Sequence, residues 1–171
     1  MASVIAIITT IYPNELKTSQ RGLELIASFE NCISCTYQDH IGIPTIGIGS
    51  TRDLNGKAPV KGRKLSDDEV ARLFMRDIKV AEQCVDVHFN GERMPQSVYD
   101  MTVSKVYNNG CYGARWNAKA NRPTHFNRFA KAGDWYHTCE RLADFVYAGG
   151  KKSQGLINRA AKEQKECLRD L

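Results

Sequence analysis

Residues 37–49 read YQDHIGIPTIGIG, and this stretch decides which fold the sequence predicts. It mixes helix-breaking residues with β-branched residues that favour extended strands. The helix breakers are Gly42, Pro44, Gly47 and Gly49, and the strand formers are Ile41, Ile43, Thr45, Ile46 and Ile48. We therefore expect a small β-hairpin region between residues 35 and 50.

The residues before this stretch predict a helix that ends close to Glu30. Thr18 or Ser19 can cap its N-terminus, because a side-chain oxygen there accepts a backbone N–H of the first turn. Apolar residues recur along it at helical spacing, namely Leu23, Ile26 and Ala27. Glu30 continues this spacing, so we expect it on the same face of the helix.

The residues after position 50 predict a polar loop and then a series of helices. Residues 66–69 read SDDE, a capping box that opens a long amphipathic helix through about His88. Further helices are expected at 96–107, 123–132, 134–146 and 154–169. No βαβ alternation is present, so the predicted fold class is α+β. We expect an apolar segment (1–18) and a domain (19–171) made of a hairpin lobe (31–65), a connecting helix (66–88) and a helical lobe (89–171), with a cleft between the lobes.

Composition narrows the function only slightly. The 171 residues carry a formal net charge of +5, which fits a solvated basic surface or a polyanionic partner such as nucleic acid or the bacterial envelope. The largest clusters of basic residues, at 57–64 and 151–152, are too short for a nucleic-acid-binding arm. We expect no nucleic-acid partner.

Six cysteines indicate disulfide bonds and an oxidising compartment. They are Cys32, Cys35, Cys84, Cys111, Cys139 and Cys167. A zinc site would need a second C-x-x-C or an H-x-x-x-H after Cys32-x-x-Cys35, and the sequence has neither. A redox-active C-x-x-C stays open as an alternative. We expect no metal and no cofactor.

Residues 2–12 read ASVIAIITTIY and form an uncharged, apolar segment. As a helix it would rise only about 16 Å, which is short of a bilayer span. Three interpretations stay open: a helix or strand packed on the body, the end of an export or membrane segment, or an expression artefact. The many β-branched residues leave helix and strand equally open.

Glu30, Asp39 and Thr45 form a candidate catalytic group. Glycoside hydrolysis needs one protonated carboxylic acid for the leaving oxygen and one ionised carboxylate on the other side of the sugar. The negative end of a helix and the neighbouring Phe29 should both raise the pKa of Glu30, which suits the acid. Asp39 lies in a polar turn and should stay ionised. By spacing alone, however, a Glu and an Asp nine residues apart are usually surface charges.

The pattern Tyr37-x-Asp39-x-x-Gly42-x-x-Thr45-Ile46-Gly47-Ile48-Gly49, with Glu30 before it, resembles the active-site signature of the phage-type lysozymes, glycoside hydrolase family 24. The segments 66–77, 107–110 and 148–159 resemble further parts of that family, so the resemblance covers about residues 19–168. It implies a lysozyme-like fold. It also implies cleavage of the β-1,4 bond between N-acetylmuramic acid and N-acetylglucosamine in peptidoglycan, with inversion.

The resemblance also implies roles for particular residues. Glu30 would protonate the leaving oxygen, and Asp39 with Thr45 would hold and activate water. The candidate substrate-binding residues are Tyr37, Gly47, Tyr107 and Asn108. Among the aromatic residues of the helical lobe, we expect Tyr107 to be the most exposed. Many family members have His where this chain has Ser50, so an ion pair from that position to Asp77 is not expected.

The cysteine pattern resembles a subgroup of these enzymes, the signal-arrest-release endolysins. This implies export to the host periplasm, a transient inner-membrane association through the N-terminal segment and an inactive tethered form. Among the three pairings of the last four cysteines, we favour Cys84–Cys111 and Cys139–Cys167. A Cys32–Cys35 bond could brace the turn beside Glu30 or control activity. We expect a monomer that causes host lysis.

Three rival functions stay open, one of which is a basic nucleic-acid-binding protein. A lytic transglycosylase acts on the same glycan but needs no carboxylate for water, which makes Asp39 and Thr45 hard to explain. A non-catalytic basic binding module would need none of the three candidate catalytic residues.

Overall fold

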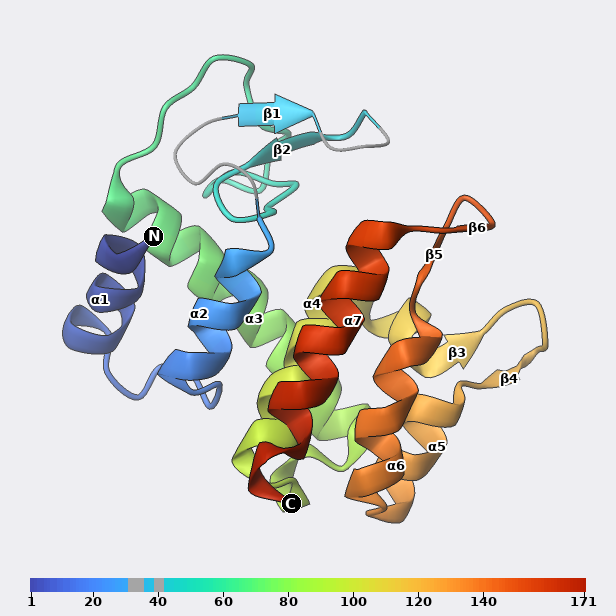
Figure 1. The fold of residues 1–171 in the computed structure, drawn as a ribbon. Coiled ribbons are helices and arrows are strands. Elements are labelled where there is room, and N and C mark those ends of the chain that lie inside the picture. The colour runs from blue at the N-terminus through green and yellow to red at the C-terminus, as the bar shows by residue number, and fades with distance from the viewer. Residues whose placement is uncertain (31–35, 39–41) are drawn as a thin grey trace. The chain divides into compact units, whose positions relative to one another are not determined.

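A computed structural model describes residues 1–30, 36–38 and 42–171 of the chain (Figure 1). It divides into two compact units, Met1–Val80 and Ala81–Leu171. The described helices and hairpins match the α+β expectation, with mainly helical structure and short antiparallel β-hairpins.

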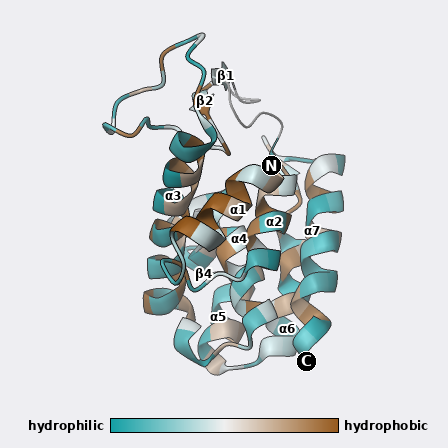
Figure 2. Cartoon of the chain, turned by 90° about the vertical axis from the view of Figure 1, so that its left-hand side faces the viewer, coloured by the Kyte–Doolittle hydropathy of each residue, from teal (hydrophilic) through white to brown (hydrophobic). Residues whose placement is uncertain are grey.

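The first unit begins with helix α1 (Ala2–Ile11), which packs against α2 (Gln20–Ser28). Figure 2 shows α1 as a largely apolar helix, and its Val4, Ile5 and Ile8 are buried. The hydroxyl groups of its Thr9 and Thr10 donate to backbone carbonyls one turn earlier in the helix. The open choice between strand and helix is thus settled as a helix.

Helix α2 has the predicted cap and the predicted buried face. The Ser19 hydroxyl accepts the Gly22 N–H at 3.1 Å. Leu23, Ile26 and Ala27 are buried, as their spacing predicts.

Strands β1 (Thr36–Gln38) and β2 (Pro44–Ile46) form the expected hairpin and pair antiparallel, with Tyr37 opposite Thr45. The long helix α3 (Asp67–Phe89) begins at the predicted capping box, in which Glu69 N–H donates to Ser66 Oγ and Ser66 N–H donates to Glu69 Oε2. Among the helices of the described residues, none is long and apolar enough to cross a membrane.

The second unit contains the end of α3 and four further helices. These are α4 (Gln96–Arg115), α5 (His125–Ala132), α6 (Trp135–Glu140) and α7 (Gln154–Cys167), with short 3-10 helices η1 (Gly91–Arg93), η2 (Arg141–Asp144) and η3 (Leu168–Asp170). Helix α4 packs on α7, and α5 packs on α6. Residues 97–106 of α4 are buried without interruption, so α4 is the centre of this unit.

The expected break after residue 107 is present at Gly110, whose φ of 70° is left-handed, but the further helical stretch that continues α4 to Arg115 was not expected. Other local expectations for the second unit were wrong. The helix expected at 134–146 is a short α6 followed by η2. Two hairpins were missed, β3 (Trp116–Asn117) with β4 (Arg122–Pro123) and β5 (Tyr147–Ala148) with β6 (Lys151–Lys152).

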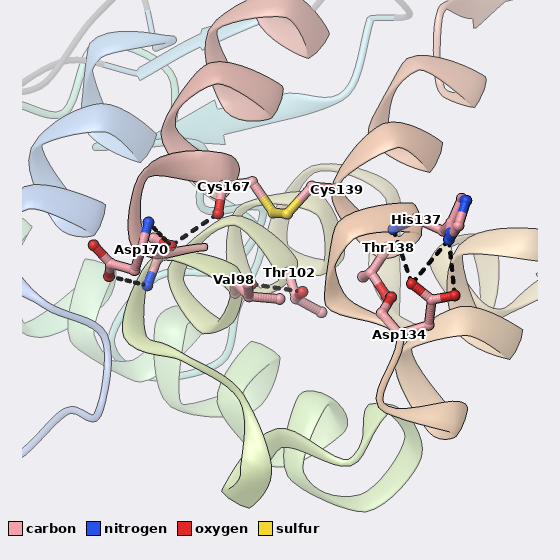
Figure 3. The surroundings of a disulfide bond; sticks show 9 residues. Val98, Thr102, Asp134, His137, Thr138, Cys139, Cys167 and Asp170 are labelled. Atoms are coloured by element: carbon pink, nitrogen blue, oxygen red, sulfur yellow. Dashed lines mark hydrogen bonds and ion pairs between the residues drawn. A yellow bond between two sulfur atoms is a disulfide. The ribbon is translucent and has the colours of Figure 1, made fainter.

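Two disulfide bonds join helices of the second unit. Cys84 of α3 is bonded to Cys111 of α4, and Cys139 of α6 is bonded to Cys167 of α7 (Figure 3). These are the two pairings that we favoured. The expectations for Cys32 and Cys35 lie outside the described residues and stay predictions.

Candidate active site

Thr45 occupies the middle of β2 and is only 3% exposed. Its hydroxyl donates to the carbonyl oxygen of Ile43 at 3.0 Å. A hydroxyl has one hydrogen and two lone pairs, so an oxygen whose hydrogen is already used can still accept a hydrogen bond from water. The strand therefore holds Thr45 as an oriented acceptor.

Glu30 lies just beyond α2, which ends at Ser28 with Phe29 as its C-cap. The backbone N–H of Glu30 donates to Ala27 O at 3.2 Å, which continues the last turn of the helix. Glu30 is partly exposed. It thus follows the helix closely, where the unpaired carbonyls concentrate negative charge. Asp39 lies outside the described residues and stays a prediction.

The residues around Thr45 are held by a tight turn. Gly47 is buried, and its positive φ of 63° is a conformation that glycine adopts without strain. Ser50 closes this turn, because it exchanges two backbone hydrogen bonds with Ile46, at 2.8 and 3.0 Å. Tyr37, the cross-strand partner of Thr45, is partly exposed.

Ser50 retains a link to Asp77 that we did not expect. The Ser50 hydroxyl donates to Asp77 Oδ2 at 2.5 Å, and Ser50 is 1% exposed. A histidine at position 50 could form an ion pair with Asp77, whereas here the smaller Ser50 side chain joins the same two positions by a hydrogen bond. The link fastens the turn after β2 to α3.

The other two candidate substrate-binding residues lie in the second unit. Tyr107 and Asn108 are on α4 just before its break. Tyr107 is only partly exposed, whereas Tyr112 on the same helix is 57% exposed, so the expectation that Tyr107 is the most exposed aromatic was wrong. Asn108 is exposed, and its Oδ1 accepts a hydrogen bond from Arg159 Nη1 at 2.8 Å.

A buried polar network lies behind Asn108, and sequence reasoning missed it. Glu163 accepts hydrogen bonds from Ser104 Oγ at 2.6 Å and Arg159 Nε at 3.0 Å. Its other oxygen is 2.7 Å from Lys105 Nζ, an ion pair without the alignment of a hydrogen bond. Lys105 and Glu163 are fully buried. Helical spacing could have revealed Lys105, because it falls inside the apolar face of α4.

The described residues contain no group of three or more His, Cys, Asp or Glu side chains that could hold a metal ion.

Comparison with known proteins identifies the family. A model of the phage lysozyme family matches residues 27–163. The SAR-endolysin of Escherichia phage P1 is 33% identical over 100% of this chain and 92% of that protein. The SAR-endolysin of Haemophilus phage HP1 is 36% identical over 89% of this chain and 81% of that protein.

Solved structures agree with the sequence relatives. The crystal structure of the active form of P1 phage endolysin Lyz has a TM-score of 0.86 at 30% identity and covers 98% of this chain and 93% of that chain. The secreted inactive form of the same endolysin has a TM-score of 0.62 at 30% identity and covers 88% of this chain and 95% of that chain. The chain therefore belongs to the phage lysozyme family and is a glycoside hydrolase.

Proposed function

We propose that this endolysin hydrolyses the β-1,4 bond between N-acetylmuramic acid and N-acetylglucosamine, with Glu30 as general acid and with Asp39 and Thr45 activating water. The observation that carries the proposal is the Thr45 hydroxyl. It is buried on β2, and its hydrogen is committed to Ile43 O. Such an oxygen can accept a hydrogen from water and so orient the lone pair of that water toward the sugar.

The mechanism divides the work between the two carboxyl groups. Glu30 donates a proton to the glycosidic oxygen as the bond to the anomeric carbon breaks. Asp39 accepts a proton from the attacking water, which Thr45 helps to hold on the opposite face of the ring. This arrangement inverts the anomeric configuration, and it requires carboxyl groups about 6.5–9.5 Å apart so that a water fits between Asp39 and the sugar.

The test is the lysis of chloroform-treated Gram-negative cells, followed as turbidity, by the wild type and by three variants. Removing a general acid costs about 10²–10⁴-fold in rate, so we expect a loss of that size in Glu30→Gln. We expect about 10²-fold loss in Thr45→Val, which has a similar shape but lacks the hydroxyl that positions the water. Thr45→Ser keeps the hydroxyl and is the matched control. Equal clearing by wild type and Glu30→Gln would overturn the role of Glu30.

The mass of the products separates hydrolysis from the transglycosylase alternative. Hydrolysis adds one water and leaves a reducing muramic acid end. A lytic transglycosylase leaves an anhydro end that is lighter by one water, and finding only that product would contradict a role for Asp39 and Thr45 in water activation.

We also propose that the chain is exported and tethered through α1 before it acts. The support is the apolar character of α1 and the two SAR-endolysin relatives, which match the chain along most of its length. In this state the apolar side chains that α1 buries here would instead contact lipid. Fractionation of cells that express the full chain tests this: a product that is never found with the membrane would contradict the proposal.

A further inference from the structure

Arg76 of α3 joins three acceptors with one guanidinium group. Its Nη1 donates to Asp53 O at 2.7 Å, and its Nη2 donates to Arg52 O at 3.1 Å. Its Nε donates to Asp77 Oδ1 at 2.8 Å. Arginine can hold acceptors in several directions because its donors are fixed in one plane, which neither glutamine nor lysine can reproduce.

The same contacts continue to the candidate catalytic threonine. Asp77 takes the Arg76 bond on Oδ1 and the Ser50 hydroxyl on Oδ2. Ser50 is in turn bonded to Ile46 through both of its backbone groups. Ile46 directly follows Thr45 in β2. One continuous chain of hydrogen bonds therefore runs from α3 to the residue beside Thr45.

The far end of the same segment is also rigid. The Asp53 carboxylate accepts the backbone N–H groups of Asn55 and Lys57, and Asp53 N–H donates to Lys57 O. These bonds within the turn already fix its conformation. The hydrogen bond from Arg76 to Asp53 O therefore fixes where the turn lies relative to α3. Residues 46–53 are thus attached to α3 at both ends.

We propose that Arg76 is a positioning residue for Thr45, acting through the Asp77–Ser50 link and the carbonyls of residues 52 and 53. The inference rests on the proposed role of Thr45. Arg76 is a residue that none of the sequence motifs singled out. Its loss would leave the strand intact but allow the turn that follows Thr45 to shift on α3, and misplacement of a reacting group by about 1 Å can cost about 10²-fold in rate.

The experiment compares Arg76→Gln with Arg72→Gln in the full chain, measuring kcat, KM and the melting temperature on solubilised peptidoglycan. Arg72 lies one turn earlier on α3, and its replacement by glutamine removes the same charge. The ion pair that Arg72 makes with Asp68 is weak, with 4.0 Å between Nη1 and Oδ2. We expect kcat to fall at least about tenfold in Arg76→Gln with KM nearly unchanged, because orientation of water affects the transition state rather than binding. Arg72→Gln should keep kcat within about twofold of wild type.

A double-mutant cycle separates positioning from a merely structural role. If Arg76 acts through Thr45, then Arg76→Gln should lower kcat little further in a Thr45→Val background. A full multiplicative loss in that background, or an unchanged kcat in Arg76→Gln alone, would overturn the inference. Ser50→Ala breaks the same link without removing a charge and should lower kcat in the same direction, which keeps the test valid if Arg76→Gln folds poorly.

The two proposals fail in different ways. If Thr45→Val keeps the wild-type kcat, the proposed role of Thr45 is wrong, and with it the inference about Arg76. If Thr45→Val loses activity but Arg76→Gln and Ser50→Ala do not, only the inference about Arg76 is wrong.

Discussion

The buried pair of Lys105 and Glu163 should respond very differently to the loss of one partner or the other. Glu163 contacts two positive charges, Lys105 and Arg159, and also the Ser104 hydroxyl, whereas Lys105 has one counter-charge among the described residues, Glu163, and lies 5.2 Å from the centroid of the Phe145 ring. Burial also lowers the pKa of Lys105 more than the attraction of Glu163 raises it. The ammonium group is therefore the less well compensated of the two charges.

The magnitudes follow from this asymmetry. In Glu163→Gln, the side chain can still accept from Ser104 and Arg159, but Lys105 remains buried without its counter-charge. Breaking a buried pair in this way costs about 3–5 kcal/mol of unfolding free energy. In Lys105→Met, Glu163 keeps its bonds to Arg159 and Ser104, and an apolar side chain of similar length fills the space. We expect this variant to lie within about 1 kcal/mol of wild type or to be more stable.

Urea unfolding of the oxidised protein near pH 7, followed by circular dichroism, measures both free energies. The pH dependence adds a second check. Because burial lowers the pKa of Lys105 in the folded state, the folded state carries no penalty from this side chain above the unfolded pKa, and it loses stability as the pH falls from there through the folded pKa. Any excess of the unfolding free energy of Lys105→Met over that of the wild type should therefore become smaller toward pH 10 and above. Equal losses in the two variants, or a larger loss in Lys105→Met, would refute the reasoning.

Three further predictions concern stability. Replacing Cys139 and Cys167 together with serine should lower the unfolding free energy by about 3.5 kcal/mol, a value that follows from their sequence separation of 28. Calorimetry should show a lower melting temperature for this double variant than for the oxidised wild type. Asp170→Ala should cost about 1 kcal/mol in urea unfolding, because its carboxylate caps α4 at Ser97 N–H. The N–H of Lys57, above all, holds the pKa of Asp53 below its usual range, so Asp53 stabilises the fold above about pH 4 and loses this effect as the pH falls; Asp53→Asn should flatten acid unfolding in that range.

Local signals in the sequence account for much of the first unit. The capping box at 66–69 and the Ser19 cap are contacts within one helical turn, so the residues that make them are close in sequence. The hairpin of β1 and β2 follows from β-branched residues between glycines, since a two-stranded pairing with a short connection is also local. The same reasoning located Thr45, because a motif of fixed spacing can be identified in the sequence without knowing how the chain packs.

Local signals failed where neighbours distant in sequence decide the outcome. Asn108, Asn109 and Gly110 correctly predict the break in α4, but they do not predict that the helix resumes after Gly110, where Cys111 is bonded to Cys84. Gly149 and Gly150, each with positive φ, form the tight turn between β5 and β6, a hairpin that the sequence did not predict.

By itself, the sequence determined the class of fold, the positions of most helices in the chain and the three residues proposed for catalysis, because spacing, caps and motifs are properties of neighbouring residues. Only the tertiary structure decided that Arg76 holds the turn after Thr45 and that Lys105 meets Glu163. These contacts join residues between 23 and 58 positions apart, so packing, rather than the spacing of neighbouring residues, decides which side chains meet.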